Sequence, residues 1–453
     1  MRGEAAEGPP SKRMCNRPPS GYSACVKRSE EIAPERGAAP ATERGERSEI
    51  LLGVPVAPGE PCCPDLTARL TTELRLAFPA RPATVVYLAP RGTHGALQAV
   101  LADASPSLPA DAAGAAATME RPSPLAGGFT GARSALPALL REARRRDVAV
   151  CALVSPVRHD ATTDWLRLLV TPVAEQGYDF VCPAYRRRKL DGALITGIAY
   201  PLTRALFGQR LRQPLGGELA LSRRFADLLL DDDTWQREPA HAGTDVWVVG
   251  AALSDDHRVC QAFLGGAPEE GGEKPADASE ALSRVLGLLF REVERRAPIW
   301  QRITGSEPVA TFGAGGVLEG EAQAPNVARL VDAFDLGRRQ LREVWTRALP
   351  ANTLFSLSRL SREPVDTFRV PDELWARVVY DFALAYHQRL MDRAQLLRSM
   401  TPLYLGWLAS FANGVRDLDG PGTEERVERL CQAFEGAKPY LIARWRWPDR
   451  FSP

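Results

Sequence analysis

The chain has 453 residues, of which 45% are hydrophobic and 25% are charged, and its formal net charge is +1. This length favours more than one domain, and the near-neutral charge gives no general attraction to nucleic acid or to an anionic membrane. Because no apolar run is long enough to span a membrane and the eight cysteines form no CxxC pair, we expect a reduced, cytoplasmic protein.

Residues 1–46 are rich in Gly, Pro, Ala, Glu and Arg without periodicity, which predicts a disordered tail. After it, short apolar runs of strand length alternate with patterns of helical spacing. The runs are 50–56, 83–89, 148–154, 178–185 and 258–265, and helical patterns precede three of them at 66–76, 134–146 and 165–173. This alternation predicts an α/β domain over 47–275, with a mostly parallel, Rossmann-like sheet and helices on both faces.

The C-terminal third has a different pattern. Apolar residues recur at helical spacing in several segments after a Gly/Glu-rich stretch at 265–275, without further strand-like runs. These segments are 282–293, 327–345, 374–386, 396–411 and 427–445. The pattern predicts an all-helical domain over 276–453 that packs as a bundle against the sheet domain.

The stretch QPLGGE (213–218) sets two adjacent glycines before a carboxylate. Such a pair serves a turn that needs positive φ, a backbone that approaches a ligand closely, or a plain connection before a helix that starts near Ser222. In an open parallel sheet, ligands bind at the carboxyl ends of the strands. We therefore expect segments 55–56, 89–95, 155–160 and 183–189 to surround one crevice.

Several of these pieces together resemble the glycosyltransferases of the GT-A fold. The similar groups are the glucosyl-3-phosphoglycerate and mannosylglycerate synthases and their bacterial relatives. The likeness covers residues 49–265, with QPLGGE as its most specific piece, and extends into the helical third. It is carried by GVP (53–55), YDFVCPAYRRRKLDG (178–192), ITGIAYPLTRALFG (195–208), AGTDVW (242–247), CQAFLG (260–265), PDELWARVVYDFALAYH (371–387) and SMTPLYLGWLASF (399–411).

The resemblance implies two groups of site residues. Glu218 would hydrogen-bond the hydroxyl groups of the donor sugar, and Asp245 would lie near the acceptor; these two are the catalytic candidates. The donor candidates are Pro55, Val56, Arg91, Leu215, Gly216 and Gly217.

The acceptor candidates are Arg187, Lys189, Asp191 and Thr196. Arg187 and Lys189 belong to YRRRK (185–189), which would follow a strand end at the crevice. Arginine forks there suit the carboxylate or phosphate of a small anionic acceptor such as a glycerate. The alternative is that YRRRK is a basic surface loop. Thr196 is assigned to the acceptor by the resemblance.

The sequence also departs from the family where a metal is expected. A GT-A enzyme ends its third core strand in an Asp-x-Asp pair that binds Mg²⁺ or Mn²⁺ and so neutralises the diphosphate leaving group. Here Ser155-Pro156-Val157 stands at this position. A lysine-containing glycine turn that touches the diphosphate is replaced by GGFTGA (127–132). We therefore expect no metal and no other cofactor.

Two hypotheses follow. In the first, the protein transfers a hexose from a nucleotide sugar to a small anionic acceptor, with retention of configuration. In the second, it is a catalytically inactive or strongly altered GT-A relative that serves as a binding or assembly module. The helical third is a candidate interface for a homodimer, and neither hypothesis involves nucleic acid or a membrane span.

Overall fold

The computed structural model describes nine segments of the chain, and the expected tail 1–46 lies outside them. The described segments are 49–55, 64–91, 96–102, 128–155, 164–232, 244–254, 256–266, 275–318 and 325–447. In this part of the chain, no helix combines the length and the apolar character that are needed to cross a membrane.

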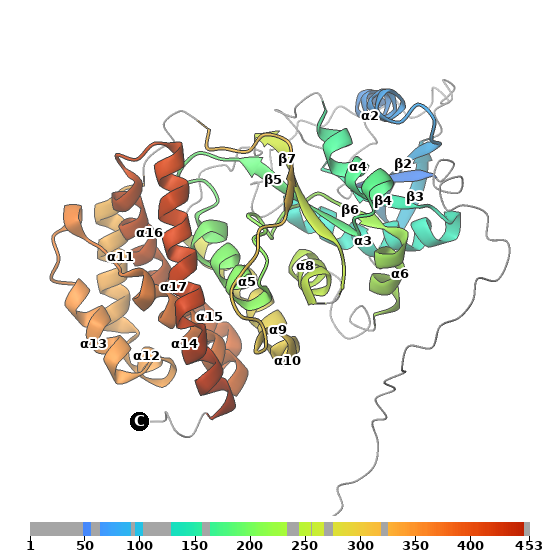
Figure 1. The fold of residues 1–453 in the computed structure, drawn as a ribbon. Coiled ribbons are helices and arrows are strands. Elements are labelled where there is room, and N and C mark those ends of the chain that lie inside the picture. The colour runs from blue at the N-terminus through green and yellow to red at the C-terminus, as the bar shows by residue number, and fades with distance from the viewer. Residues whose placement is uncertain are drawn as a thin grey trace, which may run out of the picture. The chain divides into compact units, whose positions relative to one another are not determined.

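Eight described strands form one sheet in the order β3-β2-β1-β4-β6-β5-β7-β8 (Figure 1). β3 is antiparallel to β2, and β6 is antiparallel to both of its neighbours, whereas every other pairing is parallel. Six of the eight strands therefore point the same way, which confirms the mostly parallel sheet. The strands are β1 (Ile50–Pro55), β2 (Ala83–Arg91), β3 (Ala96–Ala102), β4 (Val150–Leu153), β5 (Phe180–Arg186), β6 (Leu219–Ser222), β7 (Val259–Gly266) and β8 (Ala310–Phe312).

Helices cover both faces of this sheet, as expected. Successive side chains of a strand point to opposite faces, so Leu51 joins one apolar cluster while Ile50 and Leu52 join another. The second cluster also contains Leu70 and Leu169, which lie on helices α2 and α4. The helices of this part are α2 (Pro64–Ala77), α3 (Gly128–Arg146), α4 (Trp165–Gln176), η3 (Ile195–Ala199), α5 (Tyr200–Phe207), α6 (Arg223–Asp231) and α8 (Thr244–Ser254).

The rest of the described chain is mostly helical, which confirms the helical C-terminal region. One addition is needed, because residues 310–312 form β8 and extend the sheet beside β7. We call residues 49–266 and 301–318 the sheet region, and residues 275–300 and 325–447 the helical region. The helices of the latter are α9 (Pro275–Arg295), α10 (Ala297–Trp300), α11 (Val327–Gln340), α12 (Arg342–Ala348), α13 (Ala351–Leu360), η4 (Val365–Thr367), α14 (Asp372–Gln388), α15 (Arg393–Ser399), α16 (Thr401–Val415) and α17 (Gly420–Arg446).

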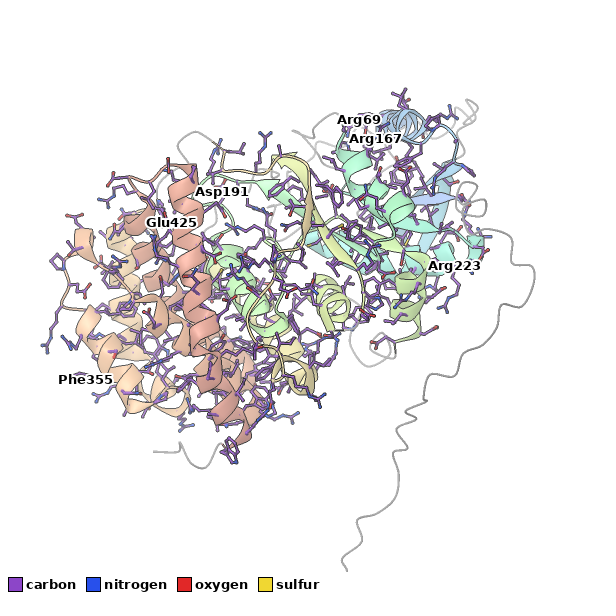
Figure 2. The ribbon with its side chains drawn as sticks, viewed as in Figure 1. Arg69, Arg167, Asp191, Arg223, Phe355 and Glu425 are labelled. Atoms are coloured by element: carbon purple, nitrogen blue, oxygen red, sulfur yellow. The ribbon has the colours of Figure 1, made fainter. Side chains whose placement is uncertain are left out.

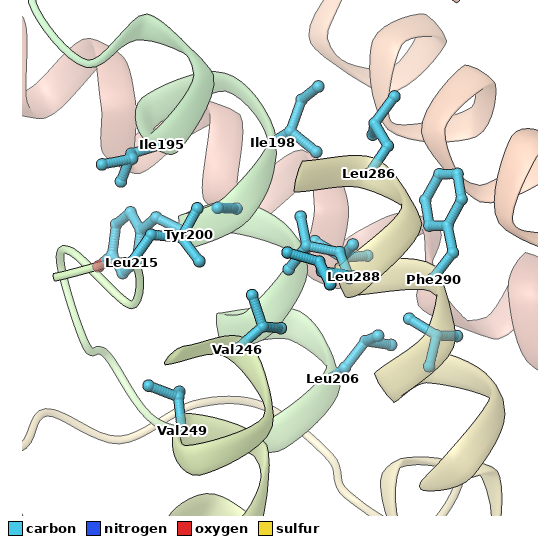
Figure 3. Packing of buried hydrophobic residues seen from close by; sticks show 14 of the residues in the cluster. Ile195, Ile198, Tyr200, Leu206, Leu215, Val246, Val249, Leu286, Leu288 and Phe290 are labelled. Carbon is cyan, nitrogen blue, oxygen red and sulfur yellow. The ribbon is translucent and has the colours of Figure 1, made fainter. Parts of the chain in front are cut away.

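The two regions share one continuous apolar cluster. Figure 3 shows side chains of η3, α5 and α8, such as Leu206 and Val246, packed with Leu286 and Phe290 of α9. Polar contacts add to this packing along α17. The buried Lys438 of this helix donates to the carbonyl oxygens of Ala205 (2.7 Å) and Ile303 (2.8 Å), at the end of α5 and in the segment that leads to β8. The helical region is therefore held against α5, α8 and the segment that leads to β8.

Candidate functional site

The turn after β5 is held by backbone contacts on both sides. Arg187 forms an isolated parallel bridge with Val317, and its carbonyl oxygen accepts from the N–H of Leu318 at 2.9 Å. Gly192 has φ of 64°, a left-handed conformation that favours glycine. A Cβ at this position would lie 3.2 Å from Cδ and Nη1 of Arg187. Gly192 thus supplies both the turn and the room in which the Arg187 side chain lies.

A cavity of about 140 Å³ opens at this turn, between the end of β5 and the start of α17. In Figure 2, Asp191 lies beside the end of α17 that carries the neighbouring Glu425. Four cationic and two acidic side chains line the cavity, which gives it a formal net charge of +2. These residues are Arg187, Arg188, Lys189, Arg212, Asp191 and Glu424. An excess of positive charge around a small cavity favours an anionic ligand.

All four acceptor candidates line this cavity. Arg187, Lys189 and Asp191 lie in the turn, and Thr196, which is only 7% exposed, lies in η3. The main-chain N–H of Arg188 donates to Asp191 Oδ2 at 3.3 Å, which closes the turn on itself. The side chain of Lys189 donates to the carbonyl oxygen of Leu418, immediately before α17. The structure therefore brings these four residues together, and every residue of YRRRK except Arg186 lines the cavity.

Gln213 positions the Arg187 side chain, a role that the sequence analysis missed. Arg187 Nε donates to Gln213 Oε1 at 3.2 Å, and Gln213 Nε2 donates to the carbonyl oxygen of Tyr185 at 2.6 Å. Gln213 is 4% exposed, so its amide is committed to these bonds. Its place at the start of QPLGGE was the one available signal, but nothing in the sequence relates it to Arg187.

Arg212 and Glu424 form a second contact that the sequence analysis missed. Arg212 donates to both carboxylate oxygens of Glu424, at 3.0 and 3.1 Å, and its guanidinium lies 5.2 Å from the centre of the Tyr200 ring. Its main-chain N–H donates to Gln261 Oε1 of β7 at 3.0 Å. This pair joins the sheet region to α17, and both of its residues line the cavity.

Packing explains the first glycine of this pair, and turn geometry explains neither. Neither Gly216 nor Gly217 has positive φ, which excludes the first of the three interpretations of QPLGGE. A Cβ on Gly216 would lie 2.1 Å from Cγ of Pro183, a distance that no side chain can occupy. Gly216 is therefore required where this stretch packs on β5. The plain-connection interpretation is partly right, because Ser222 caps α6 by accepting from the N–H of Phe225, but β6 lies between.

Glu218 lies in the interior, next to β4 and β5. It is 1% exposed; its Oε2 accepts from the hydroxyl of Tyr185 at 2.6 Å and its Oε1 accepts from the N–H of Ser155 at 3.3 Å. Neither Glu218, Leu215 nor Gly216 lines the cavity beside β5. Gly216 and Glu218 instead line a second, smaller cavity, and Tyr185, which donates to Glu218, lines the cavity of the acceptor candidates.

The remaining candidates are described only in part. Pro55 ends β1 and is buried, Arg91 ends β2, and Asp245 lies in the first turn of α8, although the side chains of the last two are outside the description. Val56 and Val157 also lie outside the described residues. The roles assigned to these residues stay predictions.

The described residues include one of the two expected ligand positions, Ser155, and not the other, Val157. Ser155, at the expected position of a carboxylate ligand, uses its N–H to bind Glu218, and the Glu218 carboxylate also holds Tyr185. In the segments that the structure describes, no group of three His, Cys, Asp or Glu side chains is placed to hold an ion. The loss of the metal site stays a prediction.

No family model matches the sequence, and no curated protein matches it. Among solved structures, the chain is similar to glucosyl-3-phosphoglycerate synthase from Mycobacterium tuberculosis in complex with Mn²⁺, UDP and phosphoglyceric acid, with 16% identity and a TM-score of 0.32 over 54% of this chain and 78% of that chain.

It is also similar to mannosyl-3-phosphoglycerate synthase from Rubrobacter xylanophilus, with 16% identity and a TM-score of 0.32 over 58% of this chain and 78% of that chain. These identities and TM-scores are too low to carry a conclusion about the activity, substrates or cofactors of this chain.

Proposed function

We propose that the cavity beside β5 binds a small anionic acceptor, and that the protein is a GT-A-type glycosyltransferase that transfers a hexose from a nucleotide sugar to this acceptor with retention. One observation carries the proposal. The four residues assigned to the acceptor by sequence meet in a single cavity whose lining has a formal net charge of +2. A basic surface loop would not enclose such a space or recruit a buried glutamine to orient one of its arginines.

The residues of this chain would act on the acceptor in distinct ways. The guanidinium of Arg187, oriented by Gln213, would bind a carboxylate or phosphate as a planar fork. Lys189 would add a point charge to the same wall, and the Thr196 hydroxyl could donate to an acceptor oxygen. Because Glu424 neutralises Arg212, it would lower the net positive charge of the cavity and so limit the negative charge of the anion that binds there. In this proposal, binding and orientation are the main contributions of the cavity.

A non-catalytic relative is the second candidate, and one observation favours it. Glu218, assigned to the donor sugar, is 1% exposed and bound to Tyr185 and to the Ser155 N–H. Each oxygen of this carboxylate already accepts one hydrogen bond from the protein, which leaves fewer acceptor sites for sugar hydroxyls. In this case the cavity would bind its anion without transfer.

Calorimetric titration with 3-phosphoglycerate tests the binding step. We expect the wild type to bind and Arg187→Met to bind roughly 10- to 100-fold more weakly, because a hydrogen bond to a charged group is lost while the side-chain stem is kept. Arg223→Met is the matched control, since Arg223 is half exposed and pairs with Asp147 on the far side of the sheet region. Equal affinity of the two variants, with unchanged thermal unfolding, would refute the assignment of the cavity.

Incubation with UDP-glucose or GDP-mannose then separates the two functions. NMR detects the product and its anomeric configuration. A glycosylated product with the anomeric configuration of the donor supports a retaining transferase. Binding of 3-phosphoglycerate without turnover by either donor supports the non-catalytic relative.

A further inference from the structure

We propose that Trp375, on α14 of the helical region, is a positioning residue for the cavity, acting through the turn that carries Thr196. The indole N–H of Trp375 donates to the carbonyl oxygen of Gly197 at 2.8 Å, and both residues are buried. Gly197 lies in η3, directly after Thr196. The inference rests on the proposed function, because it concerns the residue that faces the same anionic ligand.

η3 is a turn of π-helix, and the sequence explains why. Pro201 lies four residues after Gly197 and has no N–H, so the α-helical hydrogen bond to the Gly197 carbonyl cannot form. A proline ring also clashes with the carbonyl four residues earlier in a regular α-helix. The N–H of Tyr200 instead donates to the carbonyl of Ile195, five residues back. The wider turn relieves the clash. Trp375 donates to the Gly197 carbonyl in place of the N–H that Pro201 lacks.

This turn forms part of the cavity. Ile195 and Thr196 line the cavity from η3, and the N–H of Thr196 donates to the carbonyl oxygen of Gly192 at 3.0 Å, in the turn that holds Arg187. Single π-turns are rare and are often found at functional sites. A shift of η3 toward ordinary α-helix would rotate Thr196 relative to the cavity. The hydrogen bond from Trp375 therefore connects the helical region to the geometry of the binding site.

Trp407 provides a natural comparison with Trp375. It stacks on Trp375 with ring centres 5.7 Å apart, and a Cβ on Gly197 would lie 2.3 Å from Cη2 of its ring. Its own indole nitrogen is buried and makes no hydrogen bond with another described residue. Trp407 thus packs against η3 without bonding to it. Replacing either tryptophan by phenylalanine removes similar volume, but only the change at Trp375 removes a bond to the turn.

The test measures 3-phosphoglycerate affinity in the full chain for Trp375→Phe, Trp407→Phe, Thr196→Val and the double variant Trp375→Phe/Thr196→Val. We expect Trp407→Phe to lie within about twofold of the wild type and Trp375→Phe to bind about fivefold to tenfold more weakly, the effect of one lost hydrogen bond. Because Trp375 acts through Thr196, the double variant should bind no more weakly than the weaker single variant. Equal affinity of the two tryptophan variants, or additive losses in the double variant, would overturn the proposal.

Amide hydrogen exchange over residues 192–202, without ligand, keeps the proposal testable if the wild type binds no anion. Absence of anion binding by the wild type would refute the proposed function, but the exchange rates would still test whether Trp375 positions η3. We expect faster exchange in Trp375→Phe than in Trp407→Phe at matched thermal stability. Equal exchange in the two variants would show that Trp375 does not hold the turn.

Discussion

The sheet region and the helical region contribute opposite charges where they meet. The sheet region supplies Arg204 and Arg212, and α17 supplies Glu424, Glu428 and Glu435. On α17 these carboxylates follow a spacing of four and then seven residues, which places them on one face of the helix. Arg187, in contrast, bonds to the neutral amide of Gln213. The carboxylates of α17 therefore join the two regions through Arg204 and Arg212, and Arg212 also lines the cavity.

The largest expected effect is a loss of stability when Arg204, which pairs with α17 across the contact between the two regions, is replaced. This side chain is 1% exposed and donates to both oxygens of Glu428, at 2.5 and 2.7 Å, and to Glu435 at 2.8 Å. Removing one partner of a buried ion pair costs about 3–5 kcal/mol, and the partial exposure of both glutamates favours the lower end. We expect Arg204→Met to lower the free energy of unfolding in urea by about 3 kcal/mol.

Arg284→Met is the control for this measurement. Arg284 pairs with the exposed Glu280 one turn earlier on α9, and loss of such a surface pair costs less than about 1 kcal/mol. Similar losses for the two variants would mean that Arg204 does not join the two regions in the way described.

A second prediction contrasts the ion pairs between the two regions with a buried carboxylate inside the helical region. Asp381 of α14 is fully buried, and its Oδ1 accepts from the hydroxyl of Tyr440 at 2.6 Å and from Arg444, both on α17. Its Oδ2 has no hydrogen-bond partner among the described residues. Burial raises the pKa of Asp381 to about 6, although Tyr440 and Arg444 act in the opposite direction. The charge between α14 and α17 is therefore less well compensated than that of Arg204.

The sign of the pH effect follows from this pKa. Because the pKa is higher in the folded state than in the unfolded chain, the folded state binds more protons between pH 4 and 6, and this carboxyl group stabilises the fold less as the pH rises through that range. The loss is about 3 kcal/mol. We expect Asp381→Asn to gain stability relative to the wild type by up to this amount between pH 4 and pH 7, measured by urea unfolding. A difference between the two proteins that stays constant with pH would contradict the prediction.

The smallest expected effect is a change in ligand affinity on replacing Glu424, which pairs with Arg212 and also lines the cavity. The Glu424 side chain is about half exposed, so its influence is screened by solvent. We expect Glu424→Gln to raise 3-phosphoglycerate affinity about twofold to fivefold, because it removes the charged partner of Arg212 and one negative charge from the cavity. Calorimetry at low and high salt should show the gain mainly at low salt. Glu425→Gln is the matched control, since Glu425 pairs with Arg429. An equal gain in affinity in this variant would mean that the net charge of the protein, and not Arg212, causes the effect.

Local sequence predicted most of the fold. The five predicted strands correspond to β1, β2, β4, β5 and β7, because a strand buried on both faces leaves a continuous apolar run. β8 has only three residues, and β6, although as long as β4, does not lie within a longer apolar run as β4 does. β3, ALQAVLA, has a composition that also suits a helix. Short or ambiguous strands form when a neighbouring strand supplies hydrogen bonds, and sequence pattern does not record that neighbour.

For the site, the sequence by itself determined one wall of the cavity. Arg187, Lys189, Asp191 and Thr196 lie within ten residues, so a strand end, a glycine turn and a proline-widened helix are enough to gather them. Only the tertiary structure decided that Gln213 orients Arg187, that Glu424 pairs with Arg212 from more than 200 residues away, and that Trp375 bonds to Gly197. The physical reason is that backbone conformation follows local residue types, whereas the partner of a buried hydrogen bond is set by the packing of whole elements.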